Sequence, residues 1–260
     1  MDGVLRFSRL VSQPTGRFDL FVAAVAIGGA QGHRPDFAAA NAEIERLAQD
    51  VDSVEALRIR LFEEEGFCGD TDTYDTPGNS FVHDVLRRRR GIPVTLSLIA
   101  AEVGKRRGLD LRLIGMPGHM IVRDGADGVF FDPFYGGEVL DRAGCERRFR
   151  EATAAGDQVA FTDELLAETP PVAVLVRILE NLNGVYRRAG SLREQERVLR
   201  MRRSLPGFSL GHLLELGEVI TAQGNLETAV AELEAATPRA PAYLTATLRG
   251  AIHSLRSRLN

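Results

Sequence analysis

The C-terminal third of the chain resembles itself at an interval of 34 residues. The stretch around Gly190 aligns with the stretch around Gly224. At this offset leucines coincide at three positions, Leu179 with Leu213, Leu182 with Leu216, and Leu199 with Leu233. Repeats of about this length form helix–turn–helix units, each of which buries its apolar face only against a stacked neighbour. The pattern therefore predicts helices without strands in this part of the chain.

Prolines mark the ends of these repeats. Pro206 closes the first unit, Pro238 or Pro241 closes the second, and a last helix is expected over Tyr243–Leu259. Proline stops a helix because it lacks the backbone N–H and its ring clashes with the preceding turn. The pair Pro170-Pro171 is the predicted linker to the part of the chain that precedes the repeats.

The N-terminal part begins with helical patterns. Apolar residues at helical spacing predict helices over residues 18–66. Small residues and a proline are expected to break this region into two, at Gly28, Gly29, Gly32 and Pro35. Residues 66–79 are rich in Gly, Asp, Thr and Pro and are expected to form a loop.

Two further helices are predicted after this loop. The first covers Ser80–Arg89, with Ser80 or Asn79 as its N-cap. The second starts at Pro93, whose missing N–H is harmless in a first turn. It ends at about Arg107, where Gly108 follows and basic residues lie near the negative end of the helix dipole.

Strand-like segments follow these helices, at Leu111–Met116, Met120–Arg123 and Val129–Phe134. The glycines and aspartates of residues 124–128 predict a hairpin turn between the last two segments. Helices followed by an antiparallel meander indicate an α+β domain. We therefore expect an α+β domain at residues 1–168 and an all-α repeat region at residues 169–260.

The predicted hairpin brings a histidine and a carboxylate together. If the turn is centred between Gly125 and Ala126, His119 lies directly opposite Asp132. Opposite residues of an antiparallel pair share a face, with Cβ atoms about 5 Å apart. The carboxylate would then fix one imidazole nitrogen and leave the other as an acid or base. The alternative is a structural His–Asp pair that only closes the hairpin.

Composition narrows the classes of function. The net charge is −4, so no global basic field attracts nucleic acid. The run Arg87–Arg90 is the local exception, either a salt-bridged helix end or a site for an anion or partner. No spacing of His, Cys and carboxylates suits a metal site. His83-Asp84 is expected to be a surface pair. The sequence also contains no phosphate-binding glycine loop. We expect no cofactor and no metal.

The two cysteines, Cys68 and Cys145, form no disulfide framework and suit a reducing compartment. The first residues lack the basic and apolar segments of a signal peptide. The longest apolar stretch, Leu20–Ile27, is too short to span a bilayer. A cytoplasmic location without membrane association is therefore expected.

Several motifs in combination resemble those of the SirB family of bacteria, a branch of the transglutaminase-like superfamily. They are Tyr74–Ser80, Val85–Arg89, Gly91–Ile99, Pro117–Arg123 and Asp132–Phe134. The resemblance covers nearly the whole chain and is weakest before about Arg17 and in a loop expected around residues 147–163. It implies a papain-like, transglutaminase-like domain with an antiparallel sheet. Members commonly carry tetratricopeptide-like repeats behind that domain, which agrees with the 34-residue interval.

The same resemblance implies which site residues are present. In transglutaminase-like enzymes a nucleophilic cysteine opens a helix, and its place falls at or beside Pro93. The His and Asp of such a site carry over onto His119 and Asp132, whereas the cysteine carries over onto no residue.

Three other residues are candidates for the missing nucleophile. Thr95 and Ser97 lie in the first turns of the same helix, although such hydroxyls commonly bond back to the preceding turn. Cys68 lies in the predicted loop, either folded over the site or simply a small buried thiol. Asn79 is expected to bond loop backbone, with polarisation of a carbonyl as the alternative.

Two functions follow from this pattern. The first is a pseudoenzyme or accessory factor that acts through its cleft and binds a protein or peptide partner through its helical repeats. The alternative is an acyl-transfer or hydrolytic enzyme acting on a small amide, ester or thioester. In that enzyme His119 is the acid–base, Asp132 orients it, and water or a replacement side chain is the nucleophile.

Overall fold

The structure is a computed structural model that describes residues 3–12, 18–32, 36–154, 156, 158–237 and 242–257. Internal contacts divide the chain into two compact units, Phe18–Ile178 and a second unit made of Met1–Arg17 with Leu179–Asn260. The boundary expected from sequence near residue 168 stays a prediction. None of the described helices is long and apolar enough to cross a membrane.

The unit Phe18–Ile178 begins with α2 (Leu20–Ala30), α3 (Phe37–Leu47), α4 (Val54–Arg58) and a π-helix (Ile59–Glu64). Asp19, Asp36 and Ser53 cap the three α-helices by accepting a bond from the first-turn backbone. Contrary to the sequence prediction, Gly28 and Gly29 lie inside α2. At Gly28 the ring of His83 approaches so closely that a Cβ would collide with it.

A second set of helices leads to the site. A 3₁₀ turn (Pro77–Ser80) precedes α5 (Val82–Arg88), and Phe81 stands at the N-cap without a side-chain bond. The predicted cap at Ser80 or Asn79 is therefore wrong. The next helix, α6 (Pro93–Arg106), starts at Pro93 as predicted. It stops before Gly108, whose φ of +75° is a left-handed conformation that favours glycine.

The sheet consists of β3 (Leu111–Ile114), β4 (Ile121–Asp124), β5 (Phe130–Asp132) and β6 (Glu138–Leu140), in that order. All three pairings are antiparallel. Sequence analysis missed β6, and the predicted register of the hairpin is also wrong. Val122 pairs with Phe131, whereas the predicted turn would have placed Val129 there. The shift is two residues, so each side chain keeps its face of the sheet.

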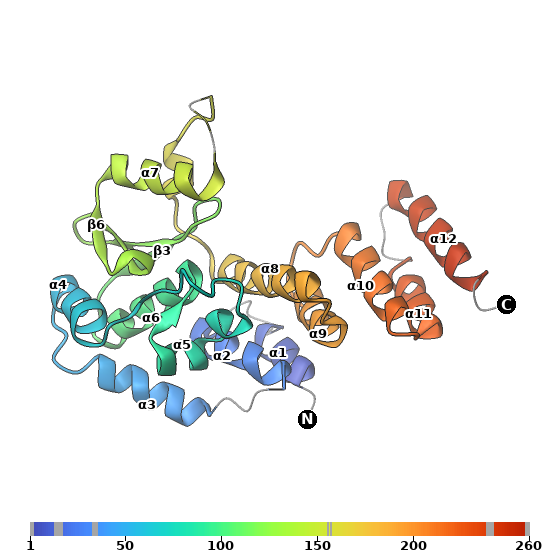
Figure 1. Cartoon of the computed structure of the whole chain (residues 1–260), viewed down its shortest axis with the longest axis horizontal. Coiled ribbons are helices and arrows are strands. Elements are labelled where there is room, and N and C mark those ends of the chain that lie inside the picture. Colours follow the sequence, from blue (N-terminus) through green and yellow to red (C-terminus); the bar gives the residue numbers. More distant parts are fainter. Residues whose placement is uncertain are drawn as a thin grey trace. The chain divides into compact units, whose positions relative to one another are not determined.

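Two helices enclose the sheet, as Figure 1 shows, with α6 on one side and α7 (Arg142–Thr153) on the other. Leu111 of β3 contacts Gly104 of α6. On the opposite face, Ile114 and Ile121 form a core cluster with Cys145 and Phe149 of α7. Residues 147–153, the first part of the loop expected around residues 147–163, are therefore helix. A two-stranded parallel pair, β1 (Cys68–Gly69) with β2 (Arg90–Gly91), lies beside the N-terminus of α6.

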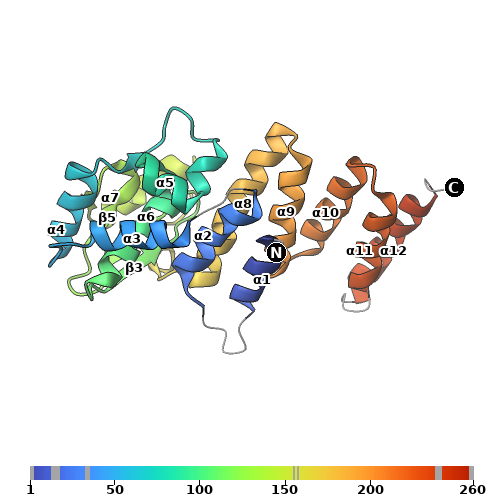
Figure 2. The ribbon, with the colours of Figure 1, turned by 90° about the horizontal axis from the view of Figure 1, so that it is seen from below.

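From Pro171 onward all described regular elements are helices. α8 (Pro171–Ala189) starts in the first unit, and the second unit contains α1 (Gly3–Val11), α9 (Leu192–Arg203), α10 (Leu210–Ala222), α11 (Leu226–Ala236) and α12 (Ala242–Arg256). Figure 2 shows α1 beside α9, followed by α10, α11 and α12. No described residue after Pro171 forms a strand, as predicted.

The aligned positions of the sequence repeat have matching environments. All six leucines of the alignment are buried. Gly190 and Gly224 both have a positive φ, +64° and +83°, in the turns between paired helices. Pro206 lies in the turn after α9, whereas Pro238 and Pro241 lie outside the described residues.

Candidate functional site at His119

His119 and Asp132 are hydrogen-bonded. Nε2 of His119 lies 2.8 Å from Oδ2 of Asp132, which confirms the predicted contact. Both side chains are buried, Asp132 completely and His119 with 5% of its surface exposed. His119 precedes β4 and lies diagonal to Asp132 rather than directly opposite. Because the two residues stay on the same face of the sheet, the shift in register preserves the contact.

The turn that carries His119 depends on Gly118. Its φ is +74°, and a Cβ there would lie 2.8 Å from the carbonyl oxygen of Ala152 on α7. The turn is closed by a bond from the His119 N–H to the Met116 carbonyl, 3.1 Å long. Close packing of backbone against α7 thus fixes where the imidazole lies.

The Asp132 carboxylate has three donors around it. Oδ2 accepts from His119 and, at 3.0 Å, from Nε of Arg148, while Oδ1 accepts from the Phe134 N–H at 3.0 Å. An ionised carboxylate only accepts, so the proton in the His–Asp bond belongs to Nε2. Nδ1 of His119 is then the acceptor nitrogen, and no described residue hydrogen-bonds to it.

Arg148 completes a network that sequence analysis missed. Its Nη1 donates to Glu151 at 3.0 Å, its Nη2 bonds Glu138, and its guanidinium stacks 3.7 Å above the Tyr135 ring. Burial opposes the charge of Arg148, but the bond to Glu151 and the surrounding carboxylates raise its pKa overall. Arg148 is therefore positively charged and forms ion pairs with three carboxylates.

A pocket of about 330 Å³ lies beside this network. Its lining is Tyr74, Pro93, Gly118, His119, Phe134, Tyr135, Arg148, Glu151 and Ala152. The first residue of α6, Pro93, thus shares a pocket with His119, as predicted. Phe134 and Tyr135 each lie with ring centroids 6.0 Å from the imidazole. The pocket therefore combines an aromatic wall with charged groups at its edge.

The three candidate replacement nucleophiles lie outside the lining of this pocket. Thr95 is fully buried, and its Oγ1 donates to the Asn79 carbonyl at 2.8 Å and accepts from the Ile92 N–H at 3.2 Å. Ser97 is also fully buried and donates to the Met120 carbonyl at 3.2 Å. Cys68 is partly exposed on β1. None of them lines the pocket.

Asn79 and Arg88 hold the neighbouring loop. Asn79 donates to the Thr73 carbonyl at 2.8 Å and accepts from Arg88 at 2.8 Å. This network positions the segment that carries Tyr74 to the pocket. The other arginines contact protein groups as well, Arg87 with Asp84, Arg89 with Glu43 and Glu65, and Arg90 with the Gly69 carbonyl.

The second cysteine belongs to the core. Cys145 is fully buried between the sheet and α7, and burial raises the pKa of its thiol to about 11. Neither Cys68 nor Cys145 forms a disulfide. Within the described part of the chain, no group of His, Cys, Asp and Glu side chains is arranged to hold a metal ion.

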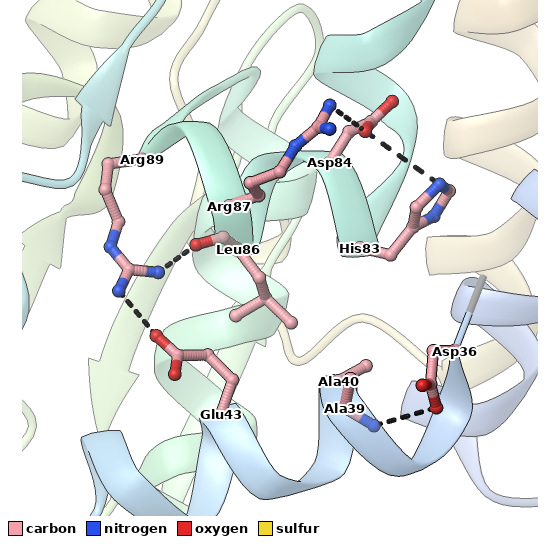
Figure 3. A pocket seen from close by; sticks show the side chains of 9 residues that line it. All are labelled: Asp36, Ala39, Ala40, Glu43, His83, Asp84, Leu86, Arg87 and Arg89. Carbon is pink, nitrogen blue, oxygen red and sulfur yellow. Dashed lines mark hydrogen bonds and ion pairs between the residues drawn. The ribbon is translucent and has the colours of Figure 1, made fainter.

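A second cavity, of about 450 Å³, lies between α3 and α5. Figure 3 shows Leu86, Ala39 and Ala40 around it, with the ion pairs of Arg87 and Arg89 on the α5 side. His83 lines this cavity and is stacked on Phe81 with ring centroids 5.9 Å apart. The expected surface pair is thus mostly covered, with 17% of the His83 side chain exposed.

Comparison with known proteins found relatives that match about half of the chain or less. A UPF0162 protein of Xylella fastidiosa is 36% identical over 148 residues, which are 55% of this chain and 52% of that protein. A UPF0162 protein of Pseudomonas aeruginosa is 29% identical over 149 residues, 55% of this chain and 53% of that protein. The mouse F-box only protein 21 is 34% identical over 94 residues, 35% of this chain and 14% of that protein.

The chain spans about half the length of the bacterial relatives it matches. No solved structure matches it. A family model described as the transglutaminase-like superfamily matches residues 36–180, which include His119, Asp132 and Arg148. Because that match covers more than half of the sequence, the chain belongs to the transglutaminase-like superfamily.

Proposed function

We propose that this chain is a binding protein, a transglutaminase-like pseudoenzyme whose pocket at His119 holds a ligand without forming an acyl intermediate. The observation that carries the proposal is the lining of the pocket. Pro93 opens α6, the position at which the resemblance to transglutaminase-like enzymes implies a nucleophile, and no cysteine, serine or threonine lines the pocket. The covalent route of cysteine, serine and threonine acyltransferases needs one of these side chains within reach of its base.

The hydrogen bonds and ion pairs around Asp132 support the same function. Asp132 is fully buried and is held by both His119 and Arg148. Arg148 is itself bound by Glu138 and Glu151. A network in which the polar groups satisfy one another stabilises a fixed pocket shape, which binding requires whether or not chemistry follows.

For the helical region, we infer a tetratricopeptide-like array that binds a protein or peptide partner. The inference is supported by the repeat interval, the matching buried leucines and the equivalent glycine turns. It also agrees with the SirB-like motifs of the first domain. A cytoplasmic location is part of the same proposal and is supported by two unpaired cysteines.

A hydrolytic enzyme is the second candidate. It is supported by Nδ1 of His119, to which no described residue hydrogen-bonds. This nitrogen could accept a proton from a water that attacks an amide, ester or thioester, with Asp132 holding the tautomer. Such a reaction would not need a nucleophilic side chain at position 93.

Acyl transfer from model substrates distinguishes the binding protein from the hydrolytic enzyme. The full chain and its His119→Ala variant are incubated with p-nitrophenyl acetate and with an acetyl thioester, and nitrophenol release, thiol release and acetylated protein are measured. We expect no turnover and no acetylation that depends on His119. Turnover that disappears in His119→Ala would contradict the binding function and support the hydrolase.

A gain-of-function variant controls for an inactive preparation. Pro93→Cys is made in a background carrying Cys68→Ser and Cys145→Ala. Because this thiol would open α6 beside His119, we expect a burst of nitrophenol and one acetyl group on Cys at position 93. The background without the new thiol should give neither.

A further inference from the structure

Arg177, in the second turn of α8, is a half-buried cation that has no counter-ion among the described residues. No described residue forms a hydrogen bond or an ion pair with its guanidinium. Most other arginines around the site are paired, as Arg88 is with Asp70 and Arg148 is with Asp132. Removing a charged group from water is costly unless another charge or donor–acceptor set compensates for it. The described residues therefore leave the guanidinium of Arg177 available to a group from outside the protein.

The position of Arg177 relates it to the candidate site. A Cβ at Gly115 would lie 3.3 Å from Nη1 of Arg177, so the guanidinium is packed against the backbone at the end of β3. Gly115 is followed by Met116 and then by the turn that carries His119. The glycine leaves room for the cation immediately before this turn.

Two hydrogen bonds hold this corner in place. The Gly115 N–H donates to Oγ1 of Thr169 at 2.7 Å, and the Thr169 N–H donates to the Leu113 carbonyl at 2.7 Å. Thr169 lies just before α8, so these bonds tie the start of that helix to the edge of β3. Arg177 is consequently held in a defined place by the same unit that contains the pocket.

Tyr74 connects Arg177 with the pocket. Tyr74 lines the pocket together with His119, and its ring packs against Phe134 with centroids 6.1 Å apart. Burial raises the pKa of Tyr74, and the positive charge of Arg177 acts in the opposite direction. The charge of Arg177 thus acts on a side chain that lines the pocket.

We propose that Arg177 binds the oxyanion, a carboxylate or a phosphate group, of the ligand that occupies the His119 pocket. A guanidinium presents a planar set of donors that suits either group and forms short, charge-assisted bonds with it. Arg148, the arginine that lines the pocket, does not compete for this group, because it is already bound by Asp132, Glu138 and Glu151. This inference rests on the proposed function in taking the pocket as a ligand site.

The test is an NMR titration of the full chain with inorganic phosphate and, separately, with acetate, at constant ionic strength. The arginine Nε–H signals and the His119 ring signals are followed. We expect a saturable shift of the Arg177 and His119 signals with at least one probe. A response to phosphate alone assigns a phosphate group to the ligand, and a response to acetate alone assigns a carboxylate.

Two variants make the result specific. Arg177→Gln should abolish the saturable shift of His119, whereas Arg87→Gln should leave it unchanged. Arg87 is the matched control because its side chain is 74% exposed and paired with Asp84, as Figure 3 shows. Since Arg177 has no partner to lose among the residues that the structure describes, Arg177→Gln should also unfold at the same or a higher temperature than the wild type.

Three results would overturn the proposal. They are the absence of saturation with both probes, saturation at Arg177 that leaves the His119 signals unmoved, and a lower unfolding temperature for Arg177→Gln. The last would show that the guanidinium stabilises the fold rather than a ligand. The titration measures binding and not turnover, so hydrolysis of model esters would overturn the proposed function and leave the Arg177 result intact.

Discussion

Arg148 donates from Nε to Oδ2 of Asp132 at 3.0 Å, the same carboxylate oxygen that bonds His119. The bond joins α7 to the end of β5. It places a permanent positive charge beside a completely buried carboxylate, so the His–Asp pair is held within a larger network.

Replacing Arg148 should destabilise the protein. Arg148→Met leaves the buried Asp132 carboxylate without its charged partner, and we expect the free energy of unfolding to fall by about 3 kcal/mol. The exposed pair of Arg87 with Asp84 provides the control, since Arg87→Met should cost less than about 1 kcal/mol. Urea denaturation measures both values. Equal costs for the two variants would contradict a structural role of the Arg148–Asp132 pair.

The turn before His119 should be intolerant of a side chain. Gly118→Ala must keep a φ of +74° and place a Cβ 2.8 Å from the Ala152 carbonyl oxygen. Gly108 has nearly the same φ, +75°, but open space where its Cβ would lie. We expect Gly108→Ala to cost about 1 kcal/mol, for the left-handed conformation alone. Gly118→Ala should cost about 2 kcal/mol more, because backbone must move.

Thermal and urea denaturation of the two alanine variants compare these costs. The His119 ring signals should shift in Gly118→Ala and remain in place in Gly108→Ala. Similar stabilities of the two variants would show that packing of the turn on α7 does not position the imidazole.

The buried thiol should make stability depend on alkaline pH. Burial raises the pKa of Cys145 to about 11 in the folded protein, from an ordinary value of 9.0. Below the ordinary value both states keep the proton. Between pH 9 and 11 only the unfolded state loses it, so unfolding becomes easier as pH rises, by up to about 3 kcal/mol.

The measurement is the difference between wild type and Cys145→Ala across pH 8 to 11. Buried tyrosines contribute to both proteins and cancel in the comparison. The wild type should lose stability more steeply than the variant. Parallel curves would mean that the Cys145 thiol ionises as easily in the folded as in the unfolded protein.

Local patterns in the sequence predicted the parts of the fold that short segments determine. The start of α6 at Pro93, the end of that helix before Gly108, and the paired helices around Gly190 and Gly224 all follow from helix periodicity, proline and glycine. The contact of His119 with Asp132 was also predicted, although from a register two residues away from the observed one.

Long-range contacts explain what the sequence did not reveal. The strand β6 has only three residues, and Val139 is half exposed, so it lacks an apolar alternation to identify it. The role of Arg148 depends on α7 packing against the sheet, with Cys145 and Phe149 facing the core. A sequence with several arginines in one helix does not indicate which one meets Asp132. Likewise, the sequence alone marks Gly28 as a helix breaker. Its contact with His83, which explains a glycine inside α2, joins segments that are distant in the sequence.

The central claim is that Pro93 occupies the place of a nucleophile facing His119. The most direct measurement is the rate at which iodoacetamide alkylates Pro93→Cys, from pH 5 to 9, in the background with Cys68→Ser and Cys145→Ala. At a helix N-terminus beside an imidazole the thiolate is stabilised, so alkylation should stay fast below pH 8 and slow at low pH once His119→Ala is added. An ordinary profile with a thiol pKa near ~8.5, unchanged by His119→Ala, would contradict the claim.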